Sequence, residues 1–180
     1  MLEKWKILKS KFVFENQWFK IRQDKVALPN GKTIDDFFVL IRPDIVLTLA
    51  ITCNQEIVFV RQYRHATGEI LLELPAGSFN PKLESAETAA RRELIEETGY
   101  VPQEMIFLGT LYDNPIKDTN TIHLFLAKDV RPLGFQQLDA TEEIEVVLVP
   151  LSQVMETIAQ GEIRVSGTLS AIFLGLNKLK

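Results

Sequence analysis

The chain has 180 residues, of which 46% are hydrophobic and 24% are charged, and its formal net charge at pH 7 is −4. This length fits one domain with a sizeable core, and the acidic balance, without a run of lysines and arginines, disfavours a nucleic-acid partner. No apolar stretch reaches membrane-spanning length and the N-terminus lacks an apolar signal core, so we expect a cytoplasmic protein that binds no membrane.

The first 43 residues are predicted to form an antiparallel sheet. Residues 5–24 alternate well enough for two short strands with a turn at Glu15-Asn16. Strands at 25–28 and 33–40 follow, joined through Asn30-Gly31, which is a strong hairpin signal between strand-like runs. Arg42-Pro43-Asp44 interrupts the pattern, and we place a boundary there between regions 1–43 and 44–180.

The second region predicts further strands and two terminal helices. The strands are expected at 45–52, 56–63, 70–74, 106–112, 121–127 and 143–150, and the helices at 152–160 and 168–178. The single cysteine, Cys53, stands in an apolar run and is predicted to be a small core residue rather than a nucleophile. Strands around one central helix, followed by terminal helices, predict an α+β fold in which a mixed sheet lies between helices.

The central helix is predicted between Ser85 and Gly99. Ser85 can cap its N-terminus, Glu87 places negative charge in its first turn, and Gly99 can adopt the left-handed conformation that ends a helix. Before it, Leu74-Pro75-Ala76-Gly77 is typical of a strand end that runs into a loop. Such a loop can place backbone carbonyls and amides beside the helix.

Three carboxylates, Glu93, Glu96 and Glu97, share one face of this helix because residues three and four apart are neighbours. They repel one another, and no cation stands at a spacing that neutralises all three. A hard divalent cation such as Mg²⁺ or Mn²⁺ prefers oxygen ligands and would turn this repulsion into coordination.

The alternative interpretation is a solvated acidic helix face. Ala86, Ala89 and Ala90 lie on the same side in the first two turns. Small apolar residues there indicate a face packed against protein, where unpaired charge is costly. Metal binding is therefore the favoured interpretation.

The segment from Gly77 to Tyr100 resembles the Nudix box, Gly-x5-Glu-x7-Arg-Glu-U-x-Glu-Glu-x-Gly-U, in which U is apolar. The matching residues are Glu84, Arg92, Glu93, Leu94, Glu96, Glu97 and Gly99. Six residues rather than five separate Gly77 from Glu84, and Leu83 replaces the glycine that commonly precedes this glutamate. The insertion leaves the helix in register, so altered contacts are expected in the loop and in the pairing of Glu84 with Arg92.

The resemblance extends over residues 5–175 and is closest to the ADP-ribose pyrophosphatase branch of the Nudix hydrolases. The segments that carry it are residues 60–64, 72–77, 114–115 and 120–127, with Pro115 fifteen residues beyond the box. Relatives that act on GDP-mannose and other nucleoside diphosphate sugars share several of these features. The resemblance implies a Nudix α/β/α sandwich with a mixed sheet, extended by the N-terminal antiparallel sheet.

The resemblance also implies a reaction, the Mg²⁺-dependent hydrolysis of a diphosphate bond, with Mn²⁺ as a substitute. ADP-ribose is the leading substrate and would give AMP and ribose 5-phosphate. Glu93, Glu96 and Glu97, aided by the Ala76 carbonyl, would hold the metal. Gly77, Glu84, Arg92 and Gly99 complete the structural motif.

The general base would be a box glutamate, Glu96 or Glu97, or a glutamate of the acidic loop before the strand at 143–150. In the branch that the chain resembles, a loop glutamate reaches the metals. Glu142 and Glu143 both fit that place, and Glu142 is favoured. The alternative is an acidic loop that is merely solvated.

Four further residues are candidates for substrate binding. Arg64, and with less support Arg61, would bind phosphate oxygens through the guanidinium group, although both also fit ordinary arginines at a strand end. Glu73 fits either a pocket residue or a structural salt bridge. His123 is predicted to be a hydrogen-bonded core residue rather than a base.

The fourth candidate, Trp18, rests on the resemblance alone. Relatives often build the base pocket from the N-terminal strands of a partner subunit, which implies a homodimer.

Two rival functions remain open. A catalytically silent nucleotide-sensing domain would bind ligand without turnover, although it would not need the full set of carboxylates. An enzyme for nucleoside triphosphates or RNA caps is disfavoured by the acidic balance and by the Arg61-Gln62-Tyr63-Arg64 context.

Overall fold

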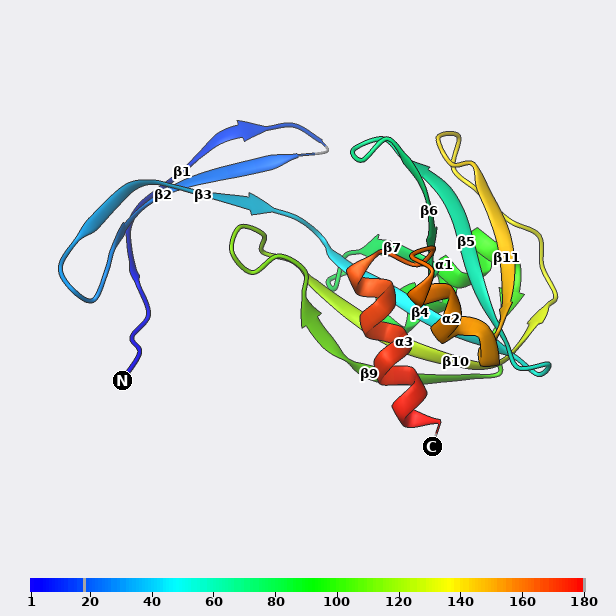
Figure 1. Cartoon of the computed structure of the whole chain (residues 1–180). Coiled ribbons are helices and arrows are strands. Elements are labelled where there is room, and N and C mark those ends of the chain that lie inside the picture. Colours follow the sequence, from blue (N-terminus) through cyan, green and yellow to red (C-terminus); the bar gives the residue numbers. More distant parts are fainter. Residues whose placement is uncertain (18, 180) are drawn as a thin grey trace. The chain divides into compact units, whose positions relative to one another are not determined.

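The structure is a computed structural model that describes residues 1–17 and 19–179. The chain divides into two compact units (Figure 1). The first comprises Met1–Pro43 and Tyr112–Thr121, and the second comprises Asp44–Leu111 and Ile122–Lys180. The sequence did not predict that Tyr112–Thr121 joins the first unit.

The first unit is a three-stranded antiparallel sheet in the order β1 (Lys6–Glu15), β2 (Lys20–Ala27), β3 (Thr33–Ile41). The predicted Asn-Gly turn joins β2 to β3. Gly31 has φ +80, a left-handed conformation that glycine adopts without strain, and the Leu28 amide donates to the Lys32 carbonyl at 2.8 Å. Local turn chemistry therefore sets the register of this hairpin.

The segment Tyr112–Thr121 is attached to the end of β3. The Leu40 amide donates to the Lys117 carbonyl at 2.8 Å, and the Arg42 guanidinium lies 3.3 Å from both the Asp113 and Asp118 carboxylates. The Lys117 ammonium also lies over the Phe37 ring, 4.7 Å from its centre. Charge pairs distant in sequence hold the segment there.

The second unit is built on one mixed sheet of eight strands. Its main path runs in the order β11-β5-β4-β10-β8, with β6 beside β5, β7 beside β4 and β9 beside β10. The strands are β4 (Asp44–Thr52), β5 (Glu56–Arg64), β6 (Glu69–Glu73), β7 (Ala76–Phe79), β8 (Tyr100–Val101), β9 (Glu104–Tyr112), β10 (Thr121–Pro132) and β11 (Ile144–Pro150). The β4–β10 pair is parallel, whereas β10–β8, β11–β5, β4–β5, β4–β7 and β5–β6 are antiparallel, so the sheet is mixed as predicted.

The neighbouring strands β4 and β5 diverge in the middle of this sheet. They pair only at Ala50–Val58 and Ile51–Ile57, whereas the start of β4 pairs with β7 and the end of β5 pairs with β6. The strand β7 lies where a loop was predicted from Leu74-Pro75-Ala76-Gly77. The strand forms because the divergence leaves the backbone of β4 near its start free to pair with β7. The local sequence carries no signal of this divergence.

Helices cover both faces of the sheet. Successive side chains of β4 point to opposite faces, so β4 packs against a helix on each side. Val46 packs with Ala89 and Ala90 of α1 (Ala86–Thr98), whereas Leu47 and Leu49 pack in the core that contains α3 (Ser166–Lys178). The 3-10 turn η1 (Leu151–Gln153) and α2 (Val154–Ala159) lead to α3 (Figure 1). The α/β/α sandwich predicted from the resemblance is confirmed.

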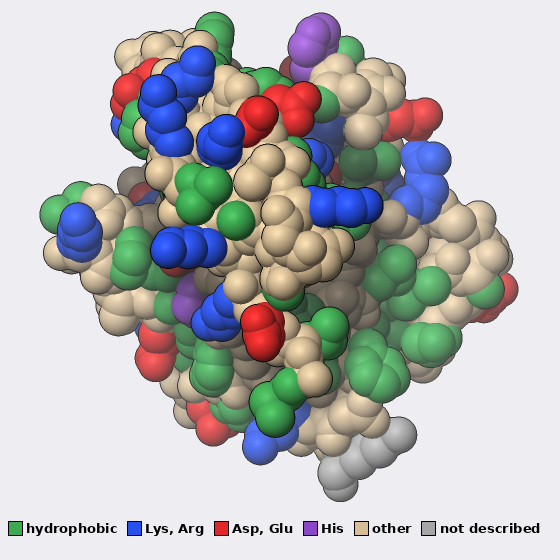
Figure 2. All heavy atoms as spheres, turned by 90° about the vertical axis from the view of Figure 1, so that its left-hand side faces the viewer, with side chains coloured by type: hydrophobic (Ala, Val, Ile, Leu, Met, Phe, Trp, Pro, Cys, Tyr) green, Lys and Arg blue, Asp and Glu red, His purple; other side chains and the backbone are tan. Residues whose placement is uncertain are grey.

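Two further expectations concern exposure. Cys53 was predicted to be buried and is exposed, because it lies in the turn after β4 rather than within the strand. No helix of the described residues is long and apolar enough to cross a bilayer. On the face drawn in Figure 2, basic side chains lie scattered among acidic and hydrophobic ones.

The N-cap of α1 is the first feature that can be tested. The Ser85 hydroxyl accepts a hydrogen bond from the Thr88 amide at 3.1 Å. Ser85→Ala is therefore expected to lower the free energy of unfolding by about 1 kcal/mol in a denaturant titration. Ser170→Ala, at a serine inside α3, serves as the control and should cost less, because alanine is favoured in helix interiors.

Candidate active site

The metal-ligand helix predicted from sequence forms as expected. Ser85 caps α1, and Gly99 ends it in the left-handed conformation at φ +71 with its amide bonded to the Ile95 carbonyl. Ala89, Ala90 and Leu94 are fully buried and fix one side of the helix against the sheet. The three box glutamates are carried beside that packed face.

Glu97 is the most deeply buried of the three, with 5% of its surface exposed. One carboxylate oxygen, Oε2, accepts a hydrogen bond of 3.0 Å from the Ala76 amide of β7. The pKa of Glu97 is raised to about 8, mainly because the carboxyl group is buried; the Ala76 amide opposes this rise, the carboxylates of Glu93 and Glu142 add to it, and the Arg64 guanidinium opposes it. In the metal-free fold the Glu97 carboxyl therefore has a pKa close to neutrality.

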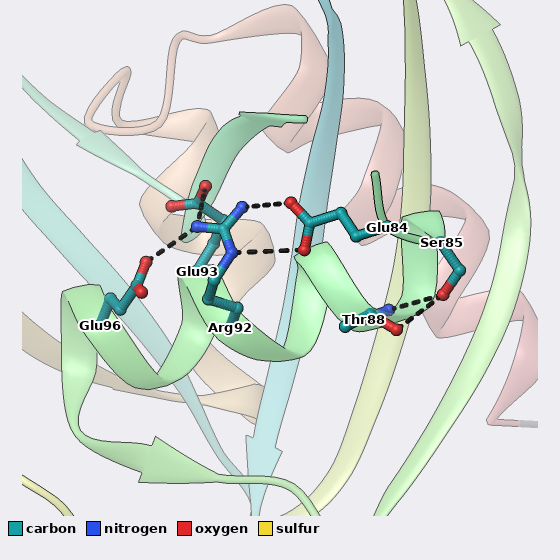
Figure 3. A network of polar contacts seen from close by, with 6 residues as sticks. All are labelled: Glu84, Ser85, Thr88, Arg92, Glu93 and Glu96. Carbon is teal, nitrogen blue, oxygen red and sulfur yellow. Dashed lines mark hydrogen bonds and ion pairs between the residues drawn. The ribbon is translucent and has the colours of Figure 1, made fainter. Parts of the chain in front are cut away.

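Arg92 binds three carboxylates at once (Figure 3). Its Nη2 lies 2.8 Å from Glu84 Oε1, and its Nη1 lies 2.8 Å from Glu93 Oε1 and 2.9 Å from Glu96 Oε2. The inserted residue before Glu84 therefore leaves the pairing of Glu84 with Arg92 intact. The hydrogen bond to Glu84 is the main reason that the pKa of Arg92 is raised.

A finished metal cage is not formed within residues 1–17 and 19–179, since no three acidic, histidine or cysteine side chains converge closely enough there. Arg92 explains why, because it draws the Glu93 and Glu96 carboxylates to its own Nη1. It neutralises two of the three box glutamates and leaves Glu97 to the Ala76 amide. Burial also raises the pKa of Glu93.

Gly77 fits this site because it has no side chain. A Cβ atom there would lie 2.0 Å from Glu93 Cδ. The backbone of β7 and the Glu93 carboxylate can therefore approach one another only with glycine at this position.

We expect Gly77→Ala to fold, because the flexible Glu93 side chain can move away from the added methyl group. The variant should bind Mg²⁺ about 10-fold more weakly, because the Glu93 carboxylate is then displaced from the site. Calorimetric titration of the metal-free protein measures the affinity, and thermal unfolding verifies the fold. Unchanged Mg²⁺ affinity in the variant would contradict a metal role for Glu93.

The predicted phosphate-binding arginines are both paired. Arg64 donates from Nε and Nη2 to the two oxygens of Glu73, at 2.8 and 3.0 Å, and this bond raises the pKa of Arg64. Glu73 therefore forms the salt bridge that was its alternative interpretation. The negative charges of Glu97 and Glu142 also raise the pKa of Arg64.

Arg61 and His123 lie elsewhere. Arg61 pairs with the exposed Glu145 of β11 at 2.9 Å. His123 is half-buried, contacts Thr110 Oγ1 through Nδ1 at 3.3 Å and packs edge-to-face on Phe79. Trp18, the candidate for base recognition, lies outside the described residues.

Most of the predicted site residues line a cleft of about 370 Å³. Its lining residues are Ala76, Gly77, Ser78, Arg92, Glu93, Glu96, Glu97, Gln137, Asp139 and Glu142. Glu142 therefore lies with the box glutamates, whereas Glu143 is not among the residues that line the cleft. Three of these residues were not predicted. Ser78 and Gln137 carry no signal in the sequence, and Asp139 belongs to an acidic run in which only the glutamates were candidates.

This geometry can be compared with known proteins. The model of the NUDIX domain matches residues 42–166, and that of the nucleoside diphosphate sugar hydrolase N-terminal domain matches residues 5–40. The chain belongs to the Nudix family. Within it, the chain is an enzyme of the branch that includes ADP-ribose pyrophosphatases and nucleoside diphosphate sugar hydrolases.

Individual Nudix relatives match nearly the whole chain. The methanol dehydrogenase activator of Bacillus methanolicus is 33% identical over 93% of this chain and 90% of its own length. The ADP-ribose pyrophosphatase of Bacillus subtilis is 32% identical over 89% of this chain and 86% of its own. A crystal structure described as an ADP compounds hydrolase superposes with a TM-score of 0.88 at 25% identity and covers 99% of this chain and 96% of that one.

Proposed function

We propose that this enzyme hydrolyses the diphosphate bond of a nucleoside diphosphate linked to a sugar, with Mg²⁺ as its cofactor and ADP-ribose as its main substrate. The observation that supports this most is the charge of the cleft. Its lining has five carboxyl groups and one guanidinium, that of Arg92. A diphosphate cannot enter such a cleft without divalent cations, because like charges in a partly desolvated site repel.

The donor set fits Mg²⁺, which takes oxygen ligands from carboxylates and substrate phosphates. Glu93, Glu96 and Glu97 would hold the ions, with the Ala76 carbonyl beside them. Bound Mg²⁺ would supply neutralisation of the diphosphate and acidification of the attacking water. Mn²⁺ would serve as a substitute, because it prefers the same oxygen ligands.

The protein's own groups have separate tasks in this proposal. With Mg²⁺ held by Glu93 and Glu96, Arg92 would stay paired with Glu84. Glu142 or Glu97 would accept the proton of the attacking water, since both carboxyl groups line the cleft. The bonds of Arg64 to Glu73 use Nε and Nη2, and we assign its Nη1 edge to a substrate phosphate.

The test is a substrate panel with Mg²⁺, in which ADP-ribose, GDP-mannose, nucleoside triphosphates and capped RNA are compared by product identity. AMP and ribose 5-phosphate are expected from ADP-ribose. Preference for another nucleoside diphosphate sugar would change the assigned substrate and leave the proposed reaction unchanged. Binding without turnover would instead favour the silent sensing domain.

We also propose that the enzyme is a homodimer whose N-terminal unit forms part of the interface. In β1 every residue is exposed, including Ile7, Leu8, Phe12 and Phe14. Exposed apolar groups of this number mark an interaction surface. Light scattering on the full chain would test this, and a monomer would contradict it. The cytoplasmic location stays a prediction.

A further inference from the structure

The segment between β10 and β11 is bound to the C-terminal end of α1. The Gly134 amide donates to the Gly99 carbonyl at 3.0 Å, and the Gln137 amide donates to the Glu96 carbonyl at 2.8 Å. Carbonyls in the last turn of a helix have no partner within the helix. The segment therefore caps the same turn that carries Glu96 and Glu97.

The Gln136 side chain joins this segment to the C-terminal turn of α1. Its Nε2 donates to the Glu97 carbonyl at 2.7 Å and to the Ile144 carbonyl at 3.1 Å. One amide group thus joins the metal-ligand helix to the first residue of β11. A glutamine suits this place because both of its N–H bonds can be used and it adds no charge beside an acidic cleft.

Between Gln136 and Ile144 the chain forms a tight turn that carries Glu142. The Glu142 amide donates to the Asp139 carbonyl at 2.9 Å, and the Asp139 amide donates to Glu142 Oε2 at 2.9 Å. These reciprocal bonds fix the carboxylate to its own turn. The position of Glu142 relative to Glu97 therefore depends on how the turn is attached to the helix.

Gly99 contributes to the same attachment. A Cβ atom there would lie 2.7 Å from the Gly134 carbonyl oxygen. The box glycine therefore has two tasks: it adopts the left-handed conformation that ends α1, and it lets the backbone of the segment approach the helix.

We propose that Gln136 is a positioning residue for the hydrolysis, and that it holds the Glu142 turn over the box glutamates. This inference rests on the proposed function, in which Glu142 takes part in proton removal. It assigns to Gln136 an effect on the reaction that passes through Glu142, not a general contribution to folding. A misplacement of about 1 Å in a reacting group can lower a rate about 100-fold.

The test uses Gln136→Leu, which keeps the approximate size and removes both donors. With ADP-ribose and Mg²⁺ we expect kcat to fall about 10-fold or more while KM stays within about twofold, because Glu142 acts in the transition state. In a Glu142→Gln background, Gln136→Leu is expected to have little further effect, because the two residues act as one unit. Gln160→Leu, at an exposed glutamine of the α2 end, is the matched control and should retain full activity.

Amide hydrogen exchange measures, independently of catalysis, whether Gln136 holds the Glu142 turn against α1. Exchange at Asp139 and Glu142 should become faster in Gln136→Leu and remain unchanged in Gln160→Leu. Unchanged exchange would overturn the attachment, and equal losses of kcat with and without Glu142 would overturn the positioning role. A wild-type enzyme that hydrolyses no member of the substrate panel would contradict the proposed function itself.

Discussion

Replacing Glu97 by glutamine is expected to lower kcat by about 10²- to 10⁴-fold, the range that general acid–base residues contribute. Glutamine has the same shape as glutamate and can still accept the hydrogen bond from the Ala76 amide, which is 3.0 Å from Glu97 Oε2. The loss would therefore report the missing negative charge rather than a displaced strand. Steady-state hydrolysis of ADP-ribose with saturating Mg²⁺ measures it.

The matched control is Glu87→Gln on the same helix. Glu87 is exposed, and its pairing with Arg91 is long, at 4.0 Å. Exposed pairs of this kind contribute little, so this variant should keep kcat within about twofold of wild type. If Glu97→Gln kept full activity, both its metal role and its role as base would be wrong.

The central helix was predictable because its signals are local. Ser85, Gly99 and the alanine face lie within the helix or at its ends, and each acts there as expected. The spacing of Glu93, Glu96 and Glu97 likewise follows from helix geometry. Sequence alone was enough for this half of the site.

The other half depends on contacts between distant residues. β7 was missed because Pro75 and Gly77 are typical of a loop, and only the divergence of β4 from β5 turns the segment into a strand. Gln137 and Asp139 reach the cleft because their segment caps α1, some 40 residues earlier in the chain. Neither residue carries a local signal of its partner.

The contact of Arg92 with Glu93 was also beyond prediction. Glu93 follows it directly, and adjacent helical residues do not face each other by spacing alone. The contact exists because Nη1 reaches sideways to both Glu93 and Glu96. Because Arg92 already pairs with both glutamates, metal binding as we propose it would have to replace existing ion pairs.

Metal-free protein is expected to lose stability as the pH rises from about 4.5 to about 8. The pKa of Glu97 is about 8 in the fold, raised by burial from an ordinary value of 4.5. In this range the unfolded chain has released the Glu97 proton and the folded protein still binds it, so the free energy of unfolding falls by about 1.4 kcal/mol per pH unit for this group. Burial shifts the pKa of Glu93 in the same direction and adds to the loss.

Denaturant titrations in the presence of a chelator measure this loss, and Glu97→Gln should remove most of it, because glutamine has no proton to release. At the alkaline end of the range, the free energy of unfolding of the variant should exceed that of the wild type by roughly 2–4 kcal/mol. The variant would thus be more stable but much less active than the wild type. The same slope in both proteins would show that Glu97 is not the group responsible. Adding Mg²⁺ should stabilise the wild type most at high pH, since the metal binds the ionised carboxylate that the metal-free fold disfavours.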